Sequence, residues 1–347
     1  MRGFNYKKLT KLLLPMETVQ LLSKLNEYKG KQDLYKKQAP QLLNALKDVA
    51  IIQSTKASNA IEGIVITDRR FQTIMKDKTV LLDRSEGEIA GYKDVLELIH
   101  SSYEAIPARS SVILQLHKEM YKYIAAEGGR WKQSDNVISE TLPDGTSRIR
   151  FEPLSSFETP HAMEKVCEEF QVRKSKQDVD PLILTSVFIL DFLSIHPFHD
   201  GNGRMARLLT LLLLYTFGYE VGRFISLEKV IEDTKEGYYE SLRQSSIGWH
   251  SDQNDIIPWI NYLLSTFVAA YKQLEDRVGI LETQTGGKSH RIHSYIESKI
   301  GYFTKSDIKE ACPDISEATI NRVLKELRAE GQIEAVTRGR SARWRKL

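Results

Sequence analysis

The stretch that decides the fold is His196-Pro197-Phe198-His199-Asp200-Gly201-Asn202-Gly203-Arg204-Met205-Ala206-Arg207. It joins two strongly apolar segments, 181–195 and 203–217, which are typical of buried helices. The motif is therefore a loop between two core helices, and we expect it to face a cleft. This arrangement predicts a mainly α-helical fold built around the loop.

The loop combines several residue types that act on phosphates. Gly201 to Gly203 precede a helix, where unpaired backbone N–H groups and the helix dipole favour an anion. Arg204 and Arg207 add charge-assisted donors. Asp200 offers an oxygen of the kind that Mg²⁺ prefers, and His196 is a base near neutral pH. Each feature alone has an ordinary structural explanation, but together they predict a phosphate site with a base.

The twelve residues resemble the defining motif of the Fic family, His-x-Phe-x-(Asp/Glu)-Gly-Asn-Gly-Arg-x-x-Arg, at every specified position. The resemblance implies a protein adenylyltransferase (AMPylator), which transfers AMP from ATP to Ser, Thr or Tyr hydroxyls of proteins, itself included. It implies His196 as the catalytic base and Asp200 as the Mg²⁺ ligand. The implied ATP-binding residues of the motif are Gly201, Asn202, Gly203, Arg204, Met205, Ala206 and Arg207.

A second segment, Ser58-Asn59-Ala60-Ile61-Glu62-Gly63, resembles the inhibitory motif of class II Fic proteins, (Ser/Thr)-x-x-x-Glu-(Gly/Asn). The resemblance implies inhibitory roles for Ser58, Glu62 and Gly63, with Glu62 paired to Arg207 where the γ-phosphate of ATP would lie. Like-charge repulsion between a carboxylate and that phosphate is a coherent reason for inhibition. The alternative is a capped helix end with a solvated glutamate.

Two further segments complete the predicted site. Between Asn136 and Phe151 the apolar residues no longer follow the helical spacing, and a Pro143-Asp144-Gly145 turn lies between them. This pattern predicts a β-hairpin. It resembles the flap that Fic proteins pair with their target, through Val137, Ile138 and Ser139 here, although a purely structural hairpin is the alternative. By the same resemblance, Tyr238 and Tyr239 line the adenine pocket, unless one of them is simply core.

Helical periodicity organises the rest of the chain. We predict two helices within 18–49 with a break near Gly30, and further helices over 86–103, 110–125, 159–172, 181–195, 203–217, 227–245 and 255–281. The predicted domains are an N-terminal helical region (1–105) that carries 58–63, a Fic catalytic core (106–282), a linker (283–289) and a winged helix-turn-helix (290–347). In the last domain, Thr304 and Ser316 are predicted helix caps.

The C-terminal domain carries the positive charge of the chain. The net charge is +3, yet residues 288–347 contain 13 Lys and Arg against 8 Asp and Glu. Winged helices bind DNA through their third helix and wing, which here predicts nucleic-acid contacts by Arg322, Lys325, Arg338 and Arg340. A protein-docking module is the alternative partner class.

The sequence also limits the cellular compartment and the functional class of the protein. No apolar run reaches the length of a membrane span, and Cys167 and Cys312 are far apart, so we expect a cytoplasmic protein without disulfides. The sequence does not decide whether the protein forms a homodimer. Two alternatives to AMP transfer remain: a nucleotide-sensing, DNA-binding transcriptional regulator, and a Fic enzyme that mainly removes AMP. Turnover of ATP with AMP left on protein separates them.

Overall fold

The structure is a computed structural model that describes residues 2–38, 40–76, 80–124, 128–141, 147–282, 287–299, 301–337 and 342–346. Most of these residues are helical, so the mainly α fold is confirmed. The helices are Met16–Gln38 (α1), Pro40–Ile61 (α2), Asp68–Met75 (α3), Arg84–Ser102 (α4), Ser110–Met120 (α5), Thr159–Lys176 (α6), Pro181–Ile195 (α7), Asn202–Thr216 (α8), Leu227–Asp233 (α9), Lys235–Ser246 (α10), Ile257–Glu282 (α11), Lys288–Ser298 (α12), Lys305–Ala311 (α13) and Glu317–Ala329 (α14). The strands are Ile138–Thr141 (β1), Ser147–Phe151 (β2), Tyr302–Thr304 (β3), Ile333–Ala335 (β4) and Arg343–Lys346 (β5).

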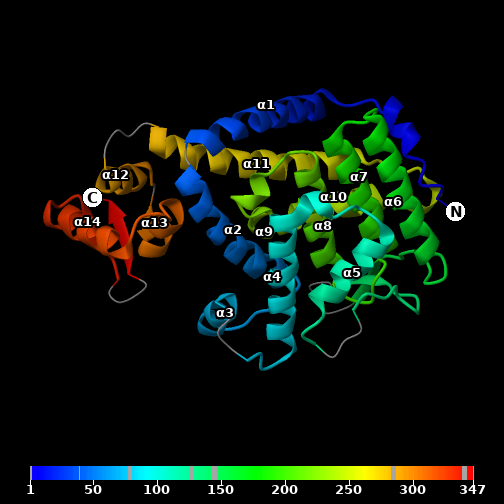
Figure 1. The fold of residues 1–347 in the computed structure, drawn as a ribbon, viewed down its shortest axis with the longest axis horizontal. Coiled ribbons are helices and arrows are strands. Elements are labelled where there is room, and N and C mark those ends of the chain that lie inside the picture. Colours follow the sequence, from blue (N-terminus) through cyan, green and yellow to red (C-terminus); the bar gives the residue numbers. More distant parts are fainter. Residues whose placement is uncertain are drawn as a thin grey trace.

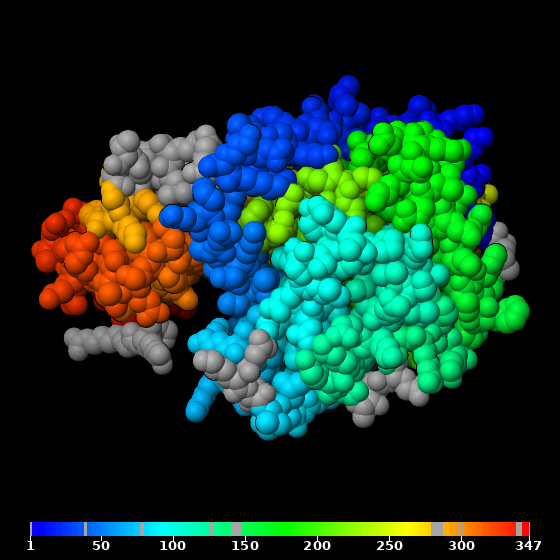
Figure 2. Space-filling model, viewed as in Figure 1, coloured from blue at the N-terminus to red at the C-terminus, as the bar shows by residue number. Residues whose placement is uncertain are grey.

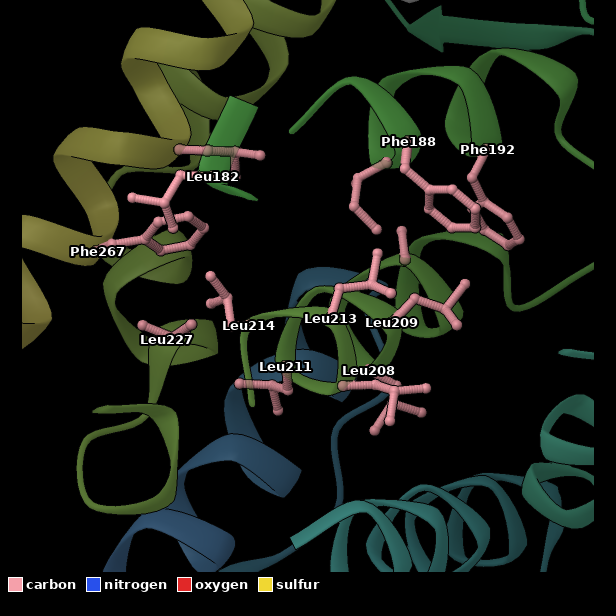
Figure 3. Packing of buried hydrophobic residues seen from close by; sticks show 14 of the residues in the cluster. Leu182, Phe188, Phe192, Leu208, Leu209, Leu211, Leu213, Leu214, Leu227 and Phe267 are labelled. Atoms are coloured by element: carbon pink, nitrogen blue, oxygen red, sulfur yellow. The ribbon is translucent and has the colours of Figure 1, made fainter. Parts of the chain in front are cut away.

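The two apolar helices that flank the loop, α7 and α8, form the centre of the main body (Figure 1). Every residue of α7 from Leu182 to Ile195 is buried, because a helix that is apolar on all sides is stable only when other elements surround it. Figure 3 shows leucines of α8 directed toward Phe188 and Phe192 of α7 on one side and toward Phe267 of α11 on another. The loop between these helices is therefore held at both ends by the core.

The N-terminal helices belong to the same body as the central helices. Leu25 of α1 and Leu46 of α2 are fully buried in the hydrophobic cluster that also contains α7 and α8. In Figure 1, α1 lies along α11, while α2 descends beside α4 and α9. The predicted division at residue 105 therefore separates sequence regions that share one hydrophobic core.

Two predicted element boundaries were wrong, and two short elements were not predicted. Helix α1 continues through Gly30 to Gln38, because its buried face runs on from Leu25 to Tyr35. Helix α2 begins at Pro40, a residue that suits the first turn of a helix. The predicted helix over 227–245 is two helices separated at Thr234. Helix α3 and strand β3 were not predicted, because both are too short for a periodic signal.

The predicted hairpin is present. Strands β1 and β2 form a two-stranded antiparallel sheet with a register irregularity between Ile138 and Ser139. The turn residues Pro143, Asp144 and Gly145 lie outside the described residues. Within the described part of the chain, β1 pairs with β2 on one side only, so its other edge carries unpaired backbone groups.

The C-terminal segment has a hydrophobic cluster of its own, which includes Ile292, Phe303, Val323 and Trp344. Its elements follow the order α12, β3, α13, α14, β4, β5, with the strands arranged β3-β5-β4, and we retain the winged helix-turn-helix as the proposal that this order supports. Thr304 and Asp307 form the predicted capping box, and the Ser316 side chain caps α14. Figures 1 and 2 show this segment beside α2, and residues 283–286 of the predicted linker lie outside the described residues.

Cys167 and Cys312 are both buried and unpaired; Cys167 lies in the core of the main body and Cys312 in the cluster of the C-terminal segment. Across the residues that the structure describes, the long apolar stretch needed to cross a membrane is not found in any helix.

Candidate functional site

His196 occupies the first position after α7, with left-handed backbone geometry at φ 51°. This conformation is uncommon for a residue with a side chain, and it turns the chain sharply out of the helix. The imidazole lines a cavity formed by α7, α8, α10 and the hairpin. The turn therefore brings a base to the edge of the core.

The surroundings of His196 keep its imidazole neutral. Burial lowers the pKa of His196 to about 4, while the Leu193 carbonyl oxygen, 3.4 Å from Nδ1, favours the protonated form only weakly. A proton on Nδ1 faces that carbonyl and leaves the Nε2 lone pair unprotonated. The side chain is thus a free base at neutral pH.

The loop after His196 is fixed by hydrogen bonds that the sequence did not reveal. The Asn202 side chain accepts from the Phe198 backbone N–H (2.9 Å) and donates to its carbonyl (2.7 Å), so this side chain holds the loop. Phe198 is fully buried and stacks on His117 at 3.7 Å between ring centroids. His117 Nδ1 accepts from the Gly129 N–H, so Nε2 carries the proton and donates to the Asp200 carbonyl.

A segment before the hairpin supports the same loop from another side. Lys132 is buried, and its Nζ donates to the Ile195 carbonyl (3.1 Å) and to Asn136 Oδ1 (2.9 Å). Burial lowers the pKa of Lys132 to about 8. The Gln133 N–H donates to His199 Nε2, which gives His199 an orienting contact. No motif in the sequence marks these residues, because their partners in the loop, Ile195 and His199, lie more than 60 positions away in the chain.

Helix α8 presents its first turn to the cavity. Gly201 is the N-cap with φ 79°, and a methyl group added there would meet the Tyr121 side chain at 2.8 Å. Gly203 lines the cavity, and a Cβ added to it would lie 2.2 Å from Glu62 Oε1. The Glu62 carboxylate therefore sits directly over the helix N-terminus, where an anion is favoured.

The segment that resembles the inhibitory motif contacts Arg207 through three hydrogen bonds. Arg207 donates from Nε to Ser58 Oγ (2.8 Å), and from Nη2 to the Ser58 carbonyl (2.9 Å) and to Glu62 Oε1 (2.8 Å). Burial opposes the charge on Arg207, but Glu62 raises its pKa above the usual value. Gly63 adopts φ 79° and ends α2, so the chain turns away directly after Glu62.

Arg204 lies in a different environment from the one that its motif position implies. Its side chain is 1% exposed and donates to Glu88 Oε2 (2.6 Å) and to the Tyr121 hydroxyl (2.9 Å). Met205 and Ala206 are likewise buried in the core, so only their backbone groups remain for a ligand. Of the motif side chains beyond the loop, Arg207 is the one that lines the cavity.

Asp200 is the residue in the loop that suits a metal ion. Its carboxylate is about half exposed and accepts from the Gly201 N–H (2.6 Å) and from Arg84 Nη2 (2.7 Å). No group of three or more His, Cys, Asp or Glu side chains within the described ranges is arranged to hold a metal. Asp200 therefore fits Mg²⁺ that takes its other ligands from phosphate oxygens and water.

The cavity continues from His196 and Gly203 toward α10 and the hairpin. Tyr238 and Tyr239 line it together with Leu242, Ile138 and Phe151. It combines aromatic and aliphatic walls, which suit the faces of a nucleobase. The structure thus brings both predicted tyrosines to the same cavity as the predicted base.

The hairpin is tied to α10 across this cavity. Arg150 of β2 donates to the Tyr239 carbonyl, and its guanidinium lies 4.9 Å from the centre of the Tyr239 ring. Of the three predicted flap residues, Ile138 lines the cavity, while Val137 and Ser139 are exposed. Arg150 has no counterpart in the motifs that the sequence displays.

The predicted nucleic-acid contacts are only partly described. Arg322 donates to Glu326 Oε1 and to Ser289 Oγ, both at 2.7 Å, whereas the Lys325 side chain is exposed. Arg338 and Arg340 lie outside the described residues. Carboxylates also pair with Arg291 and Arg345, which reduces the positive field of the segment. DNA binding stays a prediction, which titration of the whole protein with duplex DNA at increasing salt tests.

The chain is similar to known proteins in both sequence and fold. Residues 107–214 match the Fic/DOC family. The chain is 25% identical over 257 residues to the protein adenylyltransferase Fic of Nematostella vectensis, which covers 70% of this chain and 53% of that protein. A homologue of the same name from Drosophila willistoni is 22% identical over 272 residues, with 74% of this chain and 50% of that protein covered. The chain thus spans about half the length of these relatives.

Solved structures give the same fold. A Fic family protein from Desulfovibrio desulfuricans G20 aligns with a TM-score of 0.62 over 97% of both chains, at 20% identity. A Fic-domain signalling protein from Bacteroides thetaiotaomicron aligns with a TM-score of 0.58 over 74% of this chain and 95% of its own, at 22% identity. The first alignment extends along almost the whole chain, C-terminal segment included.

Proposed function

We propose that the chain is a protein adenylyltransferase that moves AMP from ATP to a Ser, Thr or Tyr hydroxyl of a protein, because residues 107–214 match the Fic/DOC family and the similar curated proteins carry that name. The observation that carries the proposal is the position of a neutral His196 in a cavity that also contains the α8 N-terminus and two tyrosines. A base, an anion site and a nucleobase-sized apolar wall are the three parts that this transfer needs.

In the proposed reaction, His196 Nε2 takes the proton of the target hydroxyl as the hydroxyl oxygen attacks the α-phosphorus of ATP. A new phosphorus–oxygen bond forms to the target, and the bond from the α-phosphorus to the β-phosphate oxygen breaks to release pyrophosphate. Backbone N–H groups at the first turn of α8 stabilise the phosphate oxygens. The loop bonds of Asn202, His117 and Lys132 hold this geometry in advance.

Asp200 would hold Mg²⁺, which would neutralise phosphate charge when bound. The Asp200 carbonyl is fixed by His117, so the position of its side chain is set by the same loop that sets His196. The role of Arg204 in this proposal is indirect, since its buried pair with Glu88 positions the start of α8 rather than contacting phosphate.

We propose further that Glu62 inhibits the transfer. Its carboxylate occupies the space above Gly203 and bonds to Arg207, the side chain that would otherwise meet the γ-phosphate. A carboxylate and a phosphate cannot share that space, and their charges repel. Target segments would add to the open edge of β1 while Ile138 contacts the reacting centre.

The test is intact-mass analysis of the Glu62→Gly protein after incubation with ATP and Mg²⁺. We expect an added AMP on this variant, much less on the wild type, and none on the Glu62→Gly/His196→Ala double variant. Equal labelling of wild type and Glu62→Gly would remove the inhibitory proposal. ATP binding without any AMP on protein would favour the alternative of a nucleotide-sensing regulator, and loss of AMP from a labelled protein would favour an enzyme that removes AMP.

A further inference from the structure

An arginine outside both motifs holds the carboxylate that suits a metal. Arg84 is the first residue of α4, and its Nη2 lies 2.7 Å from Asp200 Oδ2 while its Nε lies 2.5 Å from Glu88 Oε1. A cation in the first turn of a helix is electrostatically unfavourable, because the helix dipole is positive there. The two carboxylates offset that cost, so the position of Arg84 depends on Asp200 and Glu88.

The contacts of Arg84 close a ring of alternating charges. Glu88 Oε2 accepts from Arg204 Nη1 at 2.6 Å, and Arg204 Nη2 lies 3.5 Å from Asp200 Oδ1. Glu88 and Arg204 are almost fully buried, whereas 62% of the Arg84 side chain and 51% of Asp200 are exposed. The ring contains two carboxylates and two guanidinium groups and is therefore neutral as it stands.

The exposed half of the ring borders open space. Arg84 and Asp200 line a second cavity, together with Arg130, Trp131 and Gln133. The cavity that contains His196 reaches Gly203, three residues after Asp200 in the loop. Asp200 therefore lines the second cavity, while the same loop reaches the first cavity through His196 and Gly203. The phosphates of a nucleotide bound in the first cavity would have to extend along this loop to approach Asp200.

We propose that Arg84 makes metal binding at Asp200 conditional on the nucleotide, an inference that rests on the proposed use of ATP with Mg²⁺. A divalent ion alone would leave the neutral ring with two excess positive charges and would compete with Arg84 for Asp200. A metal ion bound to ADP, which carries about three negative charges, brings a net negative charge instead. The charge of Arg84 therefore opposes the free ion and favours the ion bound to nucleotide.

Arg84 also keeps its hydrogen bond to Glu88 when Asp200 coordinates a metal ion. Its Nε bond to Glu88 does not involve Asp200, so only Nη2 must release its partner. The freed N–H donors then face the space that phosphate oxygens enter, and guanidinium groups bind such oxygens well. Arg84 is a positioning residue by this account, because it acts through Asp200 and the phosphate charge.

The test measures Mn²⁺ binding by electron paramagnetic resonance, with and without ADP, which lacks the γ-phosphate that Glu62 would exclude. We expect Arg84→Gln to bind Mn²⁺ alone about fivefold more tightly than the wild type, and Mn²⁺ with ADP about fivefold more weakly. Arg84→Lys keeps the charge but not the two-donor geometry, so both affinities should shift in the same directions as in Arg84→Gln but by less. The matched control is Arg70→Gln, since Arg70 also pairs with a glutamate in the first turn of α4, Glu86, with two bonds of 2.6 Å.

Opposite shifts in the two arms support the proposal, because a merely structural role moves both affinities in the same direction. Shifts of the same sign, no shift, or shifts equal to those of Arg70→Gln overturn it. The failure of this inference can be told apart from the failure of the proposed function. If Glu62→Gly transfers AMP and Arg84→Gln leaves both Mn²⁺ affinities unchanged, only the Arg84 inference is lost. If wild type binds no Mn²⁺ with ADP, both the metal assignment and this inference are wrong.

Discussion

At the scale of single residues, the Glu62 carboxylate and the phosphate of the proposed nucleotide compete for the same space beside Gly203. Glu62 Oε1 would lie 2.2 Å from a Cβ on residue 203, so glycine is needed there for any anion, carboxylate or phosphate, to approach α8. Arg207 Nη1 would lie 3.3 Å from the same Cβ, and its side chain donates to Glu62 and Ser58. One position thus serves both the resting contact and the proposed nucleotide contact.

Gly203→Ala tests this shared position. The backbone at Gly203 is helical, so alanine should not destabilise α8, but its methyl group would fill the anion space. We expect the Glu62→Gly/Gly203→Ala double variant to lose at least about tenfold in AMP transfer relative to Glu62→Gly, with an unchanged circular dichroism spectrum.

The matched control for that variant is Gly237→Ala, in α10, where an added Cβ meets its nearest neighbour, Tyr262, at an ordinary 3.5 Å. It should leave the rate within about twofold. Undiminished transfer by the Gly203 double variant would mean that phosphate does not bind at the first turn of α8.

At the scale of elements, the loop between α7 and α8 is fixed by several side-chain hydrogen bonds, while the described part of the hairpin contacts α10 through β2. The loop is bonded by Asn202, His117 and Lys132. The hairpin is two strands alone, which is marginal without packing, and Arg150 joins it to α10. At its base, Phe151 stacks on His250. The wall of the nucleotide cavity formed by β1 and β2 therefore depends on Arg150 and Phe151.

Removing the Arg150 contact should open that wall. We expect Arg150→Ala, made in the Glu62→Gly protein, to raise the KM for ATP about fivefold or more while kcat falls less, because the base His196 is untouched. Arg148→Ala is the control, since Arg148 lies on the same strand but does not line the cavity. Equal kinetics for the two variants would show that the hairpin is held without Arg150.

At the scale of the whole molecule, one hydrophobic core joins the N-terminal helices to the loop 196–201, with His100 and His117 buried and His196 half-buried at its edge. Burial lowers the pKa of His196 and of His117 to about 4 and that of His100 to about 3. Each of these folded-state values lies below the ordinary value of about 6.5. The unfolded chain therefore binds more protons between pH 6.5 and about 4.

Stability should thus be full above pH 6.5 and should fall as the pH drops toward about 4. Thermal melts at pH 7.5, 6.5, 5.5 and 4.5 measure this, and most carboxylates are still ionised over that interval. We expect a steady decrease in Tm from pH 6.5 to 4.5, and a smaller decrease for His100→Gln, which keeps a polar group beside Tyr215. A constant Tm across this interval would show that the buried histidines are protonated in the folded protein.

The sequence by itself determined what was local. The motif 196–207 and the apolar segments on either side predicted the central pair of helices, the loop between them and the chemistry of His196 and Asp200, because those residues are neighbours in the chain. The capping residues Thr304 and Ser316 and the hairpin were predictable for the same reason. The continuation of α1 through Gly30 was not, because the packing of its buried face outweighs the local preference of glycine.

Only the tertiary structure decided which distant groups meet. It buried Arg204 against Glu88, placed Lys132 and His117 on the loop, and brought Arg84 to Asp200, each across 60 or more residues of chain. No periodicity records such pairings, since they arise when helices that fold locally pack by their apolar faces and carry their polar residues into contact. Chain neighbours define the chemistry of this site, and the packing of the helices defines which charges surround it.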